Sequence, residues 1–351
     1  MWMGIRNTSN PASRFLCFAL PLACAVISML AGCAAHDRGR LSGPAPVWPP
    51  PPEKARICYV DSIGGPADYG LKPSMWRRCF NFITGSDNGV EPFVQPAGVA
   101  VDEAGNLCIA DPGARAVSVF EREKRKATRW TSAGEFRFAS PVAVAKLRDV
   151  VFVADSALGK VLAFNLKGKV VFSTGKEMTR PAGLAVHGNN LLVADVQQHC
   201  ICVYTLRGAL LRKIGKRGAG HGEFNFPTHI AVDGVGRIYV TDSMNMRVQV
   251  LSQSGEYIET IGSVGDSSGH FSRPKGVAVD RFGHVYVVDA LFDNVQIFDA
   301  KGTLLLGWGS SGAGMGEFWL PTGIAAGNDD LIYVADSSNR RIQIFKYVGG
   351  E

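Results

Sequence analysis

Short apolar runs recur along most of the chain, separated by Asp, Gly, Asn and Pro residues. In the stretch 274–298, PKGVAVDRFGHVYVVDALFDNVQIF, three such runs place Val, Ile, Tyr or Phe at alternating positions. Alternation of this kind, bounded by turn-forming residues, is typical of short β-strands. The stretch therefore predicts three strands, at 277–279, 285–288 and 295–298, joined by two turns.

This pattern occurs six times, and a proline begins each copy while an aspartate ends its second strand. Both markers recur every 40 to 47 residues. The prolines are Pro96, Pro141, Pro181, Pro227, Pro274 and Pro321, and the aspartates are Asp111, Asp155, Asp195, Asp242, Asp289 and Asp336. A fourth apolar run follows in every copy except the last. Units of four antiparallel strands with this period indicate an all-β, six-bladed propeller.

The sixth copy is followed by too few residues for a fourth strand. Propellers avoid an unpaired edge by closing the ring, so we expect the segment 56–63, RICYVDSI, to supply this strand from the N-terminal side. The segment 80–84 is an alternative. However, the apolar residues from Trp76 to Ile83 recur at i, i+3, i+4 and i+7, which favours one short helix before the first blade.

The copies resemble NHL repeats. The shared features are Phe-x-x-Pro at the start of a copy, small residues in its first strand, Val-x-Asp at the end of its second strand, and NRRIQIF at 339–345. The organisation of the chain resembles that of the six-bladed propeller lipoproteins of bacteria. The resemblance covers about residues 56–347. Copy two departs from the pattern with Lys146 and Leu147 at its turn, and copy three has Met178 in place of Phe.

Two sets of positions have a structural interpretation. The residues two and four positions after each proline are Gly or Ala with one exception, and period two places them on one face of the innermost strand, where a large side chain would not fit. The exception is His229. The six aspartates end a strand, where a carboxylate accepts hydrogen bonds from the N–H groups of the next turn, so we assign them to structure.

Residues 1–32 are predicted to be a signal peptide, because two arginines precede an uncharged run at 15–30. The segment ends in Leu-Ala-Gly and is followed by Cys33. These four residues resemble the lipobox of bacterial lipoproteins, and the resemblance implies acylation, including palmitate, of Cys33. An ordinary cleaved signal with an incidental cysteine is the alternative. The signal segment predicts export. By resemblance to Gram-negative lipoproteins, Ala34 in the next position favours an anchor in the outer membrane, facing the periplasm, over retention at the inner membrane.

Residues 33–55 are proline-rich and favour an extended tether between the lipid and the propeller, which we place at 56–351. Without the two arginines of the signal peptide, the formal net charge of +6 becomes +4, which is too small to indicate a nucleic-acid partner. The cysteines outside the signal and Cys33 are odd in number, and a bridge between Cys58 and Cys79 is left open.

Four basic side chains stand near the starts of the first strands. They are His229, Lys275, Arg180 and Arg273. Together they could form a lip around the channel mouth that binds an anion or a partner, whereas the alternative is a hydrogen-bonded histidine among scattered surface charges.

The motif His-Cys-Ile-Cys at 199–202 offers three soft ligands, but we place it at an exposed strand start with no fourth ligand, and we expect no metal site and no cofactor. We expect a binding or scaffold propeller for an envelope protein, a glycan or a small ligand, with no catalytic residues assigned. The resemblance also covers a zinc lyase and calcium-dependent lactonases, so a metal-dependent hydrolase or lyase with its site at the central channel is the alternative.

Overall fold

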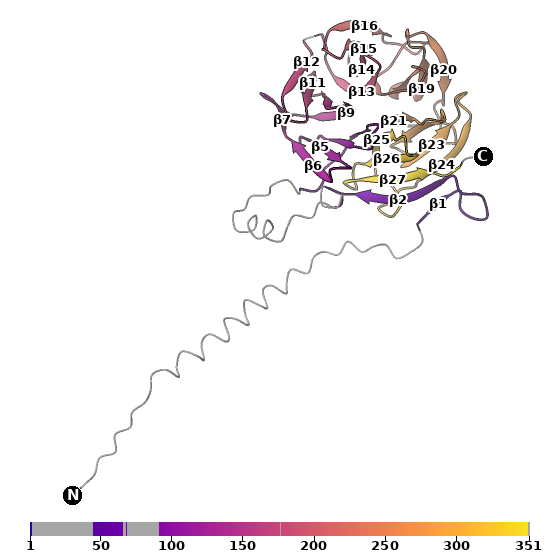
Figure 1. Ribbon diagram of the computed structural model, residues 1–351. Helices are drawn as coiled ribbons and strands as arrows, with labels where there is room; N and C mark the ends of the chain where they lie inside the picture. The colour runs from indigo at the N-terminus through magenta and orange to yellow at the C-terminus, as the bar shows by residue number, and fades with distance from the viewer. Residues whose placement is uncertain (2–44, 66–67, 69–90, 176, 350–351) are drawn as a thin grey trace. The chain divides into compact units, whose positions relative to one another are not determined.

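The computed structural model describes residues 45–65, 68, 91–175 and 177–349, together with Met1 (Figure 1). The chain divides into two compact units, Met1–Pro44 and Ala45–Glu351, and the second contains all the strands described below. The predicted signal peptide, the lipidation site Cys33, the residue Cys79 and the predicted helix around 76–83 lie outside the described residues. Among the described residues, no helix is long and apolar enough to span a membrane.

The described residues form six large antiparallel sheets, which are the blades of a propeller, and one small two-stranded sheet (Figure 1). Blade one contains β3 (Gly98–Val101), β4 (Leu107–Asp111), β5 (Ala116–Glu121) and β6 (Lys126–Trp130). A small hairpin of β7 (Ser132–Ala133) and β8 (Phe136–Arg137) leads to blade two, which contains β9 (Pro141–Leu147), β10 (Val150–Asp155), β11 (Lys160–Asn165) and β12 (Val170–Ser173). Blade three contains β13 (Pro181–His187), β14 (Asn190–Asp195), β15 (Cys200–Thr205) and β16 (Leu210–Ile214).

The remaining blades repeat the same order of strands. Blade four contains β17 (Pro227–Val232), β18 (Ile238–Asp242), a short 3₁₀ turn η2 (Ser243–Asn245), β19 (Arg247–Leu251) and β20 (Tyr257–Ile261). Blade five contains β21 (Pro274–Val279), β22 (Val285–Asp289), β23 (Asn294–Phe298) and β24 (Leu304–Trp308). Blade six contains β25 (Pro321–Ala326), β26 (Leu331–Asp336) and β27 (Arg341–Tyr347). The all-β, six-bladed architecture expected from the sequence is confirmed.

The N-terminal strand β2 (Ile57–Ile63) completes blade six, as predicted. It pairs antiparallel to β27, with Ile63 opposite Ile342 and Tyr59 opposite Phe345. A further short strand, β1 (Val47–Trp48), pairs with the outer edge of β2. The stretch from Ala45 was expected to be part of an extended tether, but it belongs to the propeller because its backbone bonds to β2: the Tyr59 N–H donates to the Pro46 carbonyl at 3.0 Å.

The innermost strands of adjacent blades lie against one another around the whole ring. Glycines on these strands face the backbone of the next blade. A Cβ at Gly98 would lie 2.7 Å from the Val142 carbonyl oxygen, and one at Gly323 would lie 2.3 Å from the Ala97 carbonyl oxygen. The small residues predicted on this strand are therefore required by the neighbouring blade, which approaches too closely for a larger side chain.

The core lies between successive blades, since each blade buries both faces. Each of the three long connections that lead into blades four, five and six contains one buried phenylalanine. These residues are spaced by 47 positions and are Phe224, Phe271 and Phe318. Each of them forms an isolated parallel bridge with a residue seven positions earlier in its connection. The buried phenylalanine therefore fixes each glycine-rich connection, and the three connections share the same bridge.

Candidate functional site

The six aspartates are buried and hold together two loops of their own blade. In blade four, Asp242 Oδ1 accepts from the Asn225 N–H at 2.6 Å, and Asp242 Oδ2 accepts from Arg247 Nε at 2.9 Å. In blade two, Asp155 accepts from the N–H groups of Ser140 at 3.0 Å and Leu158 at 3.0 Å. For Asp155 the following turn supplies the expected N–H groups, whereas Asp242 bonds there to the side chains of Asn245 and Arg247. Both carboxylates also bond to residues before the first strand, which the sequence pattern did not indicate.

We define the proline face as the end of the ring at which the six first strands begin and the six aspartates stand. The proposed basic lip lies here. Lys275 is on β21 and His229 is on β17, while Arg180 and Arg273 directly precede β13 and β21. Burial lowers the pKa of Lys275, and the nearby guanidinium groups of Arg273 and Arg180 lower it further. The structure thus brings these three positive charges within electrostatic range of one another.

His229 differs from the other three because it is uncharged at neutral pH. Burial lowers its pKa to about 3, and the charge of Lys275 contributes to the same shift. Its Nδ1 atom is inaccessible to water and has no hydrogen-bond partner among the described residues. The imidazole therefore lines this part of the channel as a neutral ring and adds no positive charge.

The channel at the axis is narrow. A cavity of about 40 Å³ is lined by His229 and by residues of all six first strands, including Gly98, Ala143 and Gly323. One water molecule occupies about 30 Å³ in the liquid, so this space suits a water or a small ion. Ligand-binding pockets typically measure about 300 to 1,000 Å³, so this cavity is much smaller than a typical site for an organic molecule.

Exposed apolar side chains stand on the proline face in the loops of blades one, four, five and six, and they were not among the candidate site residues expected from the sequence. All of them stand just before a first strand or just after one of the aspartates. They are Val94, Phe226, Met244, Leu291, Trp319 and Leu320. Trp319 is 58% exposed and Phe226 is 39% exposed. Their positions in turns, where polar residues are usual, were the available signal.

Two of these residues are held in an unusual backbone conformation by the preceding blade. Phe226 has φ 56° and Leu320 has φ 50°, a region that bulky residues rarely adopt. The Phe226 N–H donates to His199 Nδ1 at 3.2 Å, and the Leu320 N–H donates to Asp293 Oδ1 at 2.7 Å. These bonds between blades fix the two apolar side chains at the surface.

The hydrogen bond between the Phe226 N–H and His199 gives the histidine of the His-Cys-Ile-Cys motif a structural role. His199 is buried, with Nδ1 occupied by Phe226 and its ring 4.8 Å from the Phe226 ring. Cys200 and Cys202 are also buried, so the expectation of an exposed strand start was wrong: β15 is paired on both sides, and its side chains pack into the core between blades two and three. Across the described ranges, no three His, Cys, Asp or Glu residues gather as metal ligands.

The cysteines in the described ranges have free thiols. Those of Cys200 and Cys202 lie 4.0 Å apart without a covalent bond, and burial together with this contact raises the pKa of Cys202. Cys58 on β2 is also free, and its Sγ lies 3.7 Å from the Lys346 carbonyl oxygen. Its possible pairing with Cys79 falls outside the described residues.

Comparison with known proteins agrees with the blade pattern. The NHL repeat family model matches residues 224–251 and 318–345, which lie in blades four and six. Among solved structures, a streptogramin B lyase is 12% identical with a TM-score of 0.57, covering 73% of this chain and 95% of that chain. Virginiamycin B lyase from Staphylococcus aureus is 15% identical with a TM-score of 0.54, covering 73% and 96%. A hydrazine synthase from Kuenenia stuttgartiensis is 12% identical with a TM-score of 0.54, covering 73% and 96%.

These identities show the fold alone, and the named activities differ from one neighbour to another. The protein is a six-bladed β-propeller, and two of its segments, in blades four and six, match the NHL repeat.

Proposed function

We propose that this protein is an exported, lipid-anchored binding propeller whose proline face binds an acidic surface of a protein partner in the cell envelope. The observation that supports this proposal is the combination of exposed apolar side chains with the cations Arg180, Arg273 and Lys275 on one face of the ring. An aromatic and arginine-rich surface is typical of protein interfaces, whose centres are enriched in Trp, Tyr, Phe, Met and Arg.

The charges on this face specify the chemistry of the partner. The guanidinium groups of Arg180 and Arg273 form no ion pair with any residue of the described ranges, and both residues are exposed. Unpaired cations beside exposed apolar residues favour a partner that presents carboxylates around an apolar patch. Such charges also increase the association rate at low salt, and this effect weakens as the ionic strength rises.

The alternative, a hydrolase or lyase with its site in the central channel, receives less support. The channel cavity of about 40 Å³ is far smaller than the roughly 300 to 1,000 Å³ typical of ligand pockets, and the lyases named above resemble this chain only in fold. A protein partner needs no such cavity, because it contacts the face itself.

The proposed lipid anchor at Cys33 is compatible with a partner in the cell envelope. Acylation of Cys33 would hold the protein at the membrane, in our proposal the outer membrane on its periplasmic side, and residues 34–44 would separate the lipid from the folded unit that begins at Ala45. A short separation of this kind confines the propeller near the membrane and raises its effective concentration toward other envelope components.

A charge-reversal experiment tests the proposal. The partner captured from envelope extract by the wild-type chain is identified and purified, and its affinity is measured against R180E/R273E. We expect a loss of at least ten-fold, and weaker wild-type binding as salt rises. The matched control is K167E/R207E, which reverses two exposed charges in turns between third and fourth strands, at the opposite face. Equal affinity of both variants and the wild type would refute the proposal.

A further inference from the structure

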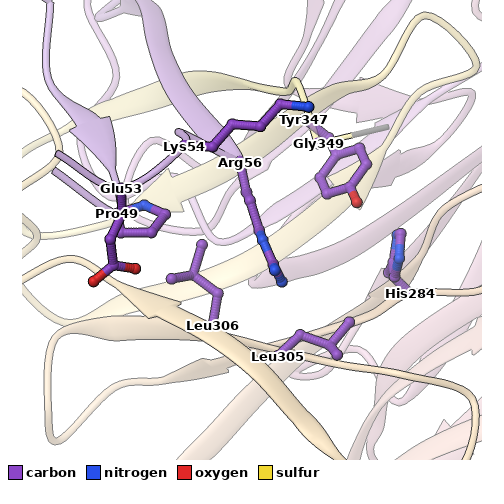
Figure 2. Close-up of a pocket in the computed structure, with 9 residues that line it drawn as sticks. All are labelled: Pro49, Glu53, Lys54, Arg56, His284, Leu305, Leu306, Tyr347 and Gly349. Carbon is purple, nitrogen blue, oxygen red and sulfur yellow. The ribbon is translucent and has the colours of Figure 1, made fainter. Parts of the chain in front are cut away.

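A second and larger cavity lies at the outer rim of the propeller, away from the channel. It has a volume of about 670 Å³ and is lined by the loop between β1 and β2, by blade five and by the end of β27 (Figure 2). Ligand-binding pockets typically measure about 300 to 1,000 Å³, so this cavity is large enough for a small organic molecule.

Arg56 is the cationic group that reaches into this pocket. Its backbone is fixed on both sides, because its N–H donates to the Trp48 carbonyl at 2.7 Å and its carbonyl accepts from the Val348 N–H at 2.8 Å. In Figure 2 its guanidinium end lies between the side chains of Leu306 and His284. No carboxylate of the described ranges forms an ion pair with it, and Glu53 lies on the other side of the pocket (Figure 2).

The wall beside Arg56 is aromatic and fixed. The rings of Tyr347 and His284 lie 4.8 Å apart, and His284 Nδ1 is hydrogen-bonded to Asp280 Oδ2 at 2.8 Å. Burial raises the pKa of the Tyr347 phenol and Asp280 adds to this shift, while Arg56 opposes it. The phenol is therefore a neutral hydrogen-bonding group, and Asp280 already has His284 and Tyr286 as partners.

The opposite part of the pocket is apolar, with Leu305 and Leu306 of β24 forming its surface, whereas Lys54 lies on the side of Arg56 and Tyr347 (Figure 2). Both leucines are only half-buried, although most apolar residues of the blades are fully covered. The pocket thus combines an unpaired guanidinium, an ammonium group, a phenol and an aliphatic surface.

We propose that this rim pocket binds an organic anion, namely a carboxylate or phosphate attached to an apolar body. Guanidinium groups bind both anions through two parallel hydrogen bonds, which makes Arg56 the group that would hold the anionic end. The apolar body lies on Leu305, Leu306 and the ring of Tyr347, where its burial is favourable. Glu53, on the other side, disfavours a second negative charge on the body.

Binding at this pocket stabilises the closure of the ring. The lining comes from the N-terminal loop, from blade five and from the last strand of blade six, and these segments meet only when β2 is paired with β27. A ligand that binds only the closed form raises its stability in proportion to the ligand concentration. The inference does not depend on the proposed binding at the proline face.

Calorimetric titration with matched eight-carbon probes tests the proposal. We expect saturable binding of octyl phosphate and octanoate, and at least ten-fold weaker binding of octylamine, which carries the opposite charge. R56Q removes the charge and is expected to weaken both anions by about ten-fold or more. The control R207Q removes an exposed arginine from a distant turn and should bind as the wild type does.

The two anionic probes also distinguish the source of the ligand. Tighter binding of octyl phosphate supports a phosphate-bearing ligand such as a lipid headgroup, and tighter binding of octanoate supports a carboxylate. Amide hydrogen exchange gives an independent readout, because a bound probe should slow exchange in β2 (Ile57–Ile63) in the wild type and not in R56Q. Absence of saturable binding by both anions, or equal affinity of R56Q and the wild type, would overturn the proposal.

Discussion

Gly323 of blade six faces the Ala97 carbonyl oxygen of blade one so closely that a Cβ at position 323 would lie 2.3 Å from it. This is the junction at which the last blade meets the first. The obstacle is backbone, so it cannot rotate away as a side chain would. Gly323→Ala is therefore expected to destabilise the protein by about 1 to 3 kcal/mol, the usual cost of overpacking, as measured by denaturant unfolding.

Gly234 is the matched control for this prediction. A Cβ there meets no atom within 4 Å, and its φ is not in the left-handed region. Gly234→Ala should be neutral or slightly stabilising, because alanine restricts the unfolded chain. Equal stability of the two variants would show that the blades have room to separate at this junction.

Asp242→Ala should lie at or above the upper end of the range given for the glycine change. The carboxylate is fully buried and accepts from the Asn225 N–H and from Arg247 Nε, so its removal leaves the arginine without its charged partner. We expect a loss of about 3 kcal/mol in the free energy of unfolding. Asp266→Ala, on an exposed blade connection, is the control and should change stability by less than about 0.5 kcal/mol. An unchanged melting temperature for Asp242→Ala would contradict the structural role.

His229 predicts a pH dependence of stability. Its pKa is about 3 in the folded protein, against an ordinary value of 6.5. Below pH 6.5 the unfolded chain binds a proton that the folded chain does not bind until about pH 3, so folding stability falls as the pH is lowered through this window. At pH 4 the loss from this one group is on the order of 3 kcal/mol.

His229→Ala should remove this contribution, so that unfolding free energies measured from pH 7 to pH 4 fall less steeply than in the wild type. Val235 is exposed and has no titratable group, so Val235→Ala serves as the control whose slope matches the wild type. Identical slopes for wild type and His229→Ala would mean that the imidazole is hydrated in the folded protein.

Cys33→Ser tests the anchor. The serine variant cannot be acylated at this position, so we expect it to leave the membrane fraction, whereas the wild type requires detergent for extraction. Cys24→Ser lies within the proposed signal peptide, so it changes a cysteine that the proposed cleavage would remove, and it should leave fractionation unchanged. Retention of Cys33→Ser in the membrane fraction would contradict lipidation at this residue.

The fold was predictable because its determinants are local and repeated. Pro227 and Asp242 mark a blade in the same way as Pro321 and Asp336, so the period of the markers defines the ring. The closing strand β2 was also predictable, since the sixth copy lacks a fourth strand and only an apolar segment outside the repeats can supply it.

The sites were less predictable because they depend on contacts between distant segments. Arg56, Leu306 and Tyr347 line one pocket although they lie in the N-terminal loop, blade five and blade six. Likewise, His199 was interpretable as a metal ligand until its bond to Phe226 in the next blade was visible. A pattern within one repeat does not contain the partner that another repeat provides.

Site-specific photo-crosslinking tests the central claim, that the proline face binds a protein partner, most directly. A photoreactive amino acid replaces Trp319 on the proline face, where the side chain is 58% exposed. In the control it replaces Val235, which is 77% exposed in a turn at the opposite face. We predict one crosslinked protein from position 319, absent from position 235 and lost when R180E/R273E is added. Equal crosslinking from both positions, or crosslinking that survives the charge reversal, would contradict the account.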